Sequence, residues 1–181
     1  MRAPLTLLTA CALVLVACGS QERGTDAEES RREEMLAQTM SANRLYAEAA
    51  KGFARSFALS DPLEAPASHR SRLAFRTGRA LAAEALARQA DPERPWLAER
   101  YAWASLVWLD EAEALDASLL AAIEPRAQLI ESGLFGDANA ERAAHLRQRF
   151  VEGVEARGGP EAALPTPAER EAYAETKSRI R

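Results

Sequence analysis

From about residue 28 onward, apolar residues recur at three- and four-residue steps, and short proline-containing stretches interrupt this spacing. Such periodicity gathers apolar side chains on one face of an α-helix. Alanine, leucine, glutamate and arginine are abundant, whereas valine, isoleucine, threonine and aromatic residues are few, a balance that favours helix over strand. The sequence therefore predicts an all-α fold, either a helical bundle or a stack of helix hairpins.

The spacing predicts three long helices in the first part of this region. One is expected over residues 28–58, a second over 68–90 and a third over 95–115. Proline-containing stretches at 61–66 and 91–95 separate them, because proline cannot continue the hydrogen-bond ladder of a helix.

Shorter helices are predicted in the C-terminal third. A helix over 116–123, capped by its first residue, is expected to be interrupted by Pro125. The next is expected to begin at Asp137 or Asn139 and to stop at the glycine pair that follows residue 157. Thr166, with a proline next and a glutamate three residues later, has a capping-box pattern that predicts a last, peripheral helix over 167–180.

The segment 95–115 is the most apolar part of this region and carries three tryptophans. Its large apolar residues fall on two helical faces: Leu97, Tyr101, Ala104 and Trp108 on one, and Trp96, Trp103 and Val107 on the other. A helix of this kind is expected to pack on both sides, as the central element of the core.

Residues 78–108 resemble the alanine-rich helix pairs of tetratricopeptide-like or Sel1-like repeats. The resemblance rests on the spacing of Ala82, Ala85, Ala98, Tyr101, Ala102 and Ala104. The glycine pattern expected of such repeats is missing, and a generic helical bundle remains the alternative.

The N-terminus has a different character. Arg2 precedes an apolar run over residues 5–16, and the chain turns polar directly after Cys18. A helix that crosses the roughly 30 Å hydrocarbon core needs about 20 apolar residues, so this run is too short to span a membrane. It is typical of a signal-peptide core.

The four residues Leu15-Val16-Ala17-Cys18 resemble the lipobox of bacterial lipoproteins. The resemblance implies cleavage before Cys18, a diacylglycerol on its thiol and acylation of the new amino group. Residues 1–17 are then the signal peptide, 18–28 a lipidated flexible tether, and 29–181 a single helical domain. Gly19, in the position where an aspartate retains enterobacterial lipoproteins at the inner membrane, implies the outer membrane, facing the periplasm.

A second cysteine also fits the lipobox pattern, in Leu8-Thr9-Ala10-Cys11. Cleavage there would shorten the apolar core to about seven residues and leave an apolar run at the start of the mature chain. With the cut at Cys18 the mature chain keeps a single cysteine, already lipidated, so no disulfide is expected.

Groups that commonly carry catalysis are scarce. The two histidines, His69 and His145, belong to no recognisable catalytic motif, and Glu141 with His145 would supply only two metal ligands. Removal of Arg2 with the signal peptide leaves 22 basic against 27 acidic residues, from the 23 and 27 of the whole chain. This net charge of −5 gives no reason to expect a nucleic-acid partner. We therefore expect a non-enzyme without cofactor or metal.

Arg72, Arg76 and Arg79 fall on one face of the predicted helix 68–90. They are candidate contacts to a phosphate, to lipid A or to an acidic partner. The alternative is that they are solvated, or that they pair with the acidic residues of the helix that follows. Two functions are thus considered: a lipid-anchored interaction or envelope-assembly module, and a carrier or sensor of a small apolar or anionic ligand in a cavity lined by Trp96, Trp103 and Trp108.

Overall fold

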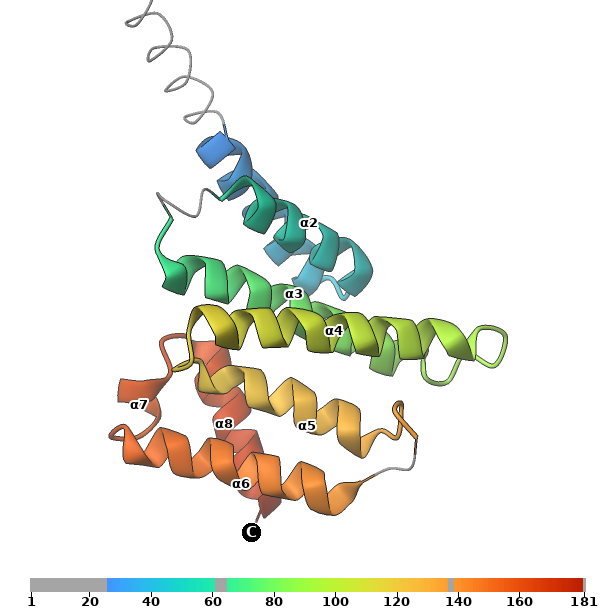
Figure 1. Cartoon of the computed structure of the whole chain (residues 1–181), viewed down its shortest axis with the longest axis vertical. Coiled ribbons are helices and arrows are strands. Elements are labelled where there is room, and N and C mark those ends of the chain that lie inside the picture. Colours follow the sequence, from blue (N-terminus) through green and yellow to red (C-terminus); the bar gives the residue numbers. More distant parts are fainter. Residues whose placement is uncertain (1–25, 61–64, 137–138, 181) are drawn as a thin grey trace, which may run out of the picture.

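The structure is a computed structural model that describes residues 26–60, 65–136 and 139–180. All regular secondary structure in these ranges is helical, which confirms the all-α class. Figure 1 shows the helices between residues 26 and 156 stacked along the long axis of the molecule, with successive helices running in opposite directions. Cys18 and Asp137 lie outside the described residues.

The predicted helix 28–58 is in fact two helices. Residues 26–42 are helical, a turn follows, and α2 spans Tyr46–Leu59. In the turn, the N–H of Leu45 donates to the carbonyl of Met40 (2.9 Å) and that of Arg44 to Ser41 (3.1 Å). Arg44 has a φ of 61°. This is the Schellman ending of a helix, with arginine in the left-handed position that glycine normally occupies.

The two helices of this first hairpin lie very close together. The hydroxyl of Ser30 donates to the carbonyl of Ser56 (2.9 Å), and both residues are buried. A Cβ on Gly52 would lie 2.8 Å from the Cβ of Ala37, closer than side-chain carbons approach. Small residues therefore allow the two helices to lie this close. The packing of this hairpin ends the first helix at residue 42, although the spacing of apolar residues continues beyond it.

The next hairpin follows the predicted ranges, with α3 at Ala67–Arg88 and α4 at Pro95–Leu115. The buried hydroxyl of Ser105 donates to the carbonyl of Gly78 (2.7 Å) across the pair. A Cβ on Gly78 would lie 2.8 Å from Cγ of Leu109, so glycine is needed for this close approach.

Only one side of α4 is buried, and the expectation that it packs on two faces is wrong. Ala98, Ala102 and Leu109 are buried against α3 and its neighbours. By contrast, Trp96 is 55 % exposed, Trp103 60 % and Val107 67 %. The helix packs chiefly on α3, and no helix of the described residues covers its opposite side, so these three side chains face solvent.

The short helix expected to stop at Pro125 runs through it. A 3₁₀ turn, η1 (Leu120–Ala122), leads directly into α5 (Ile123–Glu131), and Pro125 is the third residue of α5. In the first turn of a helix the backbone N–H has no partner within the helix, so proline removes no hydrogen bond there. Pro125 is tolerated for this reason.

The first residues of the C-terminal helices agree with the capping patterns in the sequence. Asn139 caps α6 (Ala140–Ala156), since its side chain accepts from the N–H of Arg142 at 2.8 Å. A single-turn helix, α7 (Pro160–Ala163), precedes α8 (Pro167–Ile180). α8 is less peripheral than expected, because it packs on α6 and buries Tyr173 and Thr176.

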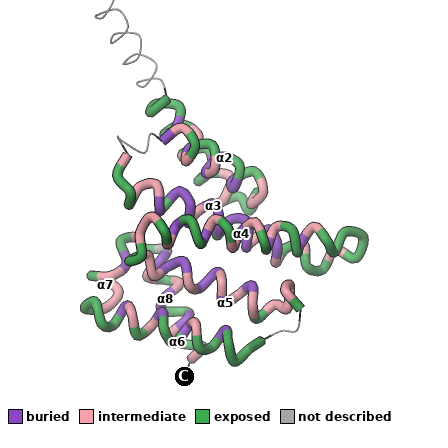
Figure 2. Tube along the Cα trace, in the orientation of Figure 1, coloured by how far each residue is buried: buried purple, intermediate pink, exposed green. Residues whose placement is uncertain are grey.

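Figure 2 shows buried residues in every layer of the stack, with exposed residues at its borders. Among the residues that the structure describes, no helix is both long enough and apolar enough to cross a bilayer.

Candidate functional site

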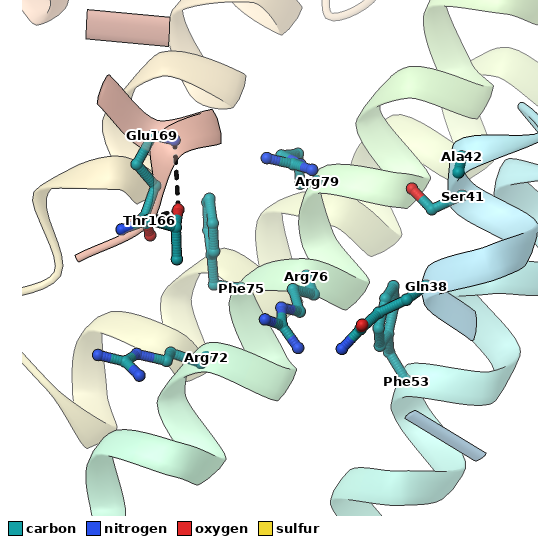
Figure 3. A pocket seen from close by; sticks show the side chains of 10 residues that line it. All are labelled: Gln38, Ser41, Ala42, Phe53, Arg72, Phe75, Arg76, Arg79, Thr166 and Glu169. Atoms are coloured by element: carbon teal, nitrogen blue, oxygen red, sulfur yellow. Dashed lines mark hydrogen bonds between the residues drawn. The ribbon is translucent and has the colours of Figure 1, made fainter. Parts of the chain in front are cut away.

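A pocket of about 410 Å³ opens between the end of helix 26–42, the middle of α3 and the start of α8 (Figure 3). We call it the arginine pocket, because all three predicted contact arginines line it. Its residues are Gln38, Ser41, Ala42, Phe53, Arg72, Phe75, Arg76, Arg79, Thr166 and Glu169.

The arginines come together because of their spacing on α3. Arg72, Arg76 and Arg79 are separated by four and three residues and therefore share one face of the helix. At 1.5 Å per residue they extend over about 10 Å along the helix axis. The sequence pattern predicted this shared face, whereas the pocket walls come from segments distant in sequence.

Arg76 already has a carboxylate partner. Its guanidinium pairs with Glu34 on helix 26–42 and lies 5.9 Å from the centre of the Phe53 ring. Both contacts join α3 to the first hairpin. Arg76 thus positions one wall of the pocket, and Glu34 offsets its charge.

Arg72 and Arg79 differ from Arg76 in this respect. Neither forms an ion pair within 4.0 Å with a carboxylate of the described residues. Arg79 lies 5.9 Å from the ring centre of Phe75, and enclosure by the pocket walls, followed by repulsion from Arg76, lowers the pKa of its guanidinium. Arginine remains protonated despite such a shift. Both side chains are exposed enough for a ligand to reach them.

The wall opposite the first hairpin is the start of α8. Glu169 accepts hydrogen bonds from the N–H and the hydroxyl of Thr166, at 3.0 and 2.8 Å, and its own N–H donates to that hydroxyl at 3.3 Å. This capping box holds the buried Glu169 carboxylate in place. The three guanidinium groups exceed the carboxylates of Glu34 and Glu169 by one positive charge.

A second pocket of about 220 Å³ adjoins the first, and Arg72 and Glu169 line both. It also contains Asp116 and Arg157. The hydroxyl of Ser118 is the main cause that lowers the pKa of Asp116, and Arg157 and Arg72 add to the effect. The two pockets therefore meet at Arg72 and Glu169, beside the first half of α3.

The acidic residues of α4 do not pair with the arginines of α3. Asp110 and Glu113 instead contact Arg126 of α5, at 2.7 and 3.2 Å. Of the two alternatives left open by the sequence, pairing across the α3–α4 hairpin is thus not found among the described residues. Arg72, Arg76 and Arg79 line the arginine pocket instead.

The three tryptophans point to different neighbours. Trp108 is half-buried and packs edge-on against Phe57 of α2, with ring centres 5.3 Å apart. Trp103 packs against Phe135, at 4.9 Å, and Trp96 is exposed. The structure therefore does not bring the three rings together.

Other sequence candidates add no site. His145 and Glu141 are exposed on α6. Within the described ranges, no three histidine, aspartate or glutamate side chains are grouped so that they could hold a metal ion.

Sequence reasoning missed the residues of the pocket walls. The sequence predicts Gln38 and Ser41 within one continuous helix, and it predicts only a helix start at Thr166 and Glu169. No local pattern signals that these segments meet, because their contact depends on the stacking of the whole chain.

No protein-family model, curated protein or solved structure matches this chain. Function is therefore inferred from the residues of the arginine pocket.

Proposed function

We propose that the protein is a lipid-anchored, periplasm-facing binding module of the cell envelope, and that its arginine pocket holds an acidic segment of another envelope protein. The main support is that Arg72 and Arg79 line the pocket while no described carboxylate pairs with them. Guanidinium groups bind carboxylates through two parallel hydrogen bonds, which gives both strength and orientation.

The shape of the site favours a chain segment over a compact ligand. The arginine pocket and the second pocket share Arg72 and Glu169, so an extended segment can reach both. Phe53 and Phe75 supply apolar surface beside the guanidinium groups, as a peptide with both acidic and apolar side chains requires. A small anionic ligand is the second candidate, because about 410 Å³ lies within the usual range of small-molecule sites.

The anchor part of the proposal rests on the lipobox ending at Cys18 and on Gly19. The described fold begins at residue 26, and Gln38 of the pocket lies 12 residues further along the same helix. That separation corresponds to about 18 Å at 1.5 Å per residue. A pocket at the far end of the first helix suits a periplasmic partner better than the headgroups of the anchoring membrane.

The test is in-cell cross-linking of the full-length protein, followed by identification of attached proteins. The variant Arg72→Glu/Arg79→Glu reverses both available charges, and Arg142→Glu/Arg149→Glu changes two exposed arginines of α6 as a control. We expect the pocket variant to lose a specific cross-linked partner by about tenfold or more, since charge-assisted hydrogen bonds contribute about 1.5–3 kcal/mol each. The control should retain it.

Immunoblotting must show equal levels of both variants, so that loss of the partner reports binding and not folding. Retention of every partner by the pocket variant would overturn the proposal. If instead the purified protein binds succinate or inorganic phosphate calorimetrically, loses this binding in the pocket variant, and has no cross-linked partner, the small-ligand alternative is correct.

A further inference from the structure

α4 presents a stripe of large apolar side chains to solvent. Trp96, Trp103 and Val107 lie on one face of the helix and are 55 %, 60 % and 67 % exposed. Figure 2 shows exposed residues recurring along this helix, which lies midway along the stack. Tryptophan is enriched among the residues that dominate protein interfaces. Two of the three tryptophans of the chain are in this stripe.

We propose that a second copy of this chain covers the stripe, with the two α4 helices packed antiparallel about a twofold axis that lies at the level of residue 105, on the side of the helix opposite the buried Ser105. Residues equally distant from that point face each other in such a pair. Trp96 then meets Ala114 of the partner subunit, and Trp103 meets Val107 of the partner subunit. Each contact joins a large side chain to a smaller exposed one, and the twofold axis repeats it.

The charged residues beside the stripe match the same arrangement. Arg100 and Glu111 lie on one flank of it, at positions symmetrical about residue 105.5, and both are exposed. Neither has an oppositely charged group of the described residues within 4.0 Å. The twofold axis places Arg100 beside Glu111 of the partner subunit, twice per dimer.

On the other flank, Glu99 would face Asp110 of the partner subunit. Asp110 is already paired with Arg126 of its own chain, at 2.7 Å, and this cation offsets the like charges. A membrane surface fits less well, although tryptophan favours the bilayer interface. The carboxylates of Glu99, Asp110 and Glu111 border the stripe, and the anionic lipids of a membrane surface attract basic groups.

The expected dimer is weak. At up to roughly 250 Å² per tryptophan, the exposed fractions of Trp96 and Trp103 leave about 300 Å² of indole surface in water on each copy. Two copies would bury about 600 Å² from these rings, roughly half of what the smaller stable interfaces bury. The rest of the buried area that a small stable interface needs would come from Val107, Ala114 and the charged flank.

The test is recovery of one full-length copy by another in the same cells, after brief chemical cross-linking. The two copies carry different C-terminal epitope tags. We expect Arg100→Glu alone, or Glu111→Arg alone, to lower recovery about fivefold, and the double variant Arg100→Glu/Glu111→Arg to restore it, because the pair is then reversed in sign. The pairing does not depend on the proposed function of the arginine pocket.

Arg149→Glu, on the exposed surface of α6, serves as the control and should recover the partner copy as the parent does. Equal recovery by the parent and both single variants would overturn the proposal, as would failure of the double variant to restore it. Cross-linking of α4 variants to lipid or to a different protein, without recovery of the second copy, would also overturn it. Protein levels of all variants are compared, and the double variant excludes a folding defect as the cause of the loss.

Discussion

Arg147 of α6 and Glu124 of α5 form an ion pair in the interior of the protein, with Nε 3.4 Å from Oε1 and the two residues only 5 % and 7 % exposed. The other oxygen of Glu124 accepts from the hydroxyl of Thr176 on α8, at 3.1 Å. Arg147 also binds Glu131 with two nitrogens, at 3.1 and 2.6 Å. This network joins three helices of the C-terminal part of the stack.

Removal of the guanidinium is expected to be strongly destabilising. Arg147→Met leaves the buried Glu124 carboxylate without its cation, so the free energy of unfolding should fall by about 3–5 kcal/mol. The free energy of unfolding is measured by urea unfolding of a soluble form that begins at Ser20. Arg149→Met, an exposed change on the same helix, should stay within about 0.5 kcal/mol of the parent. A stable Arg147→Met protein would show that the pair is dispensable.

Acid should weaken the same network. Hydrogen bonds from Arg147 are the main cause that lowers the pKa of Glu131 below its ordinary value of 4.5. Because the folded-state pKa is lower than the unfolded one, the stabilisation is present above pH 4.5 and is lost as pH falls through the folded-state value.

Glu131→Gln should therefore reduce the loss of stability that the parent shows as pH falls below 4.5. The measurement is the urea midpoint at several pH values. Glu171→Gln, an exposed glutamate of α8, should keep the pH dependence of the parent. An unchanged slope in Glu131→Gln would contradict the role assigned to this carboxylate.

Arg44→Gly should stabilise the protein. Arg44 has a φ of 61°, where a side chain costs about 1–2 kcal/mol and glycine does not. Part of this gain is lost to the greater freedom of glycine in the unfolded chain, so about 0.5–1 kcal/mol is expected. Arg31→Gly, within helix 26–42, should instead destabilise by about 1 kcal/mol. Thermal unfolding distinguishes the two, and a lower melting temperature for Arg44→Gly would refute the prediction.

The two tryptophans at positions 103 and 108 should differ in their effect on stability. Trp108 is half-buried against Phe57, so Trp108→Ala should cost about 2 kcal/mol or more. Trp103 is 60 % exposed and its main ring contact is Phe135, so Trp103→Ala should cost about 1 kcal/mol. Comparable losses in thermal unfolding for the two variants would mean that Trp103 is buried after all.

Lipidation of Cys18 is the prediction that bears on location. In cells given radiolabelled palmitate, the parent should incorporate label and Cys18→Ala should remain an unlabelled, uncleaved precursor. Cys11→Ala should be labelled like the parent, because that residue belongs to the predicted signal peptide. Equal labelling of Cys18→Ala and the parent would rule out this anchor.

The ends of two helices show how far the sequence could predict the fold. Helix α6 stops with the N–H of Gly158 on Glu155 and that of Gly159 on Val154, at 3.1 and 3.0 Å. The glycine pair in the sequence predicts that ending. Helix 26–42 stops with the same hydrogen-bond pattern, but Arg44 stands where glycine is usual. The packing of the first hairpin determines where this helix ends, and no residue pattern near Arg44 predicts that end.

The site was predictable to a similar extent. Helical periodicity was enough to place Arg72, Arg76 and Arg79 on one face. It could not distinguish the buried face of α4 from the exposed one, because both carry large apolar residues and only the neighbouring helices decide which is covered. Nor could it show that Thr166 lies beside α3.

The walls of the arginine pocket are more than 120 residues apart along the chain, since Gln38 forms one side and Thr166 the other. A chain that ends before residue 166 keeps the first hairpin and the arginines of α3 but lacks one wall of the pocket. An unfinished chain therefore carries exposed guanidinium groups without an enclosed pocket, and it also lacks Thr176, the partner of Glu124. The arginine pocket is consequently complete only when α8 has packed against the rest of the chain, so binding at this pocket requires the whole fold.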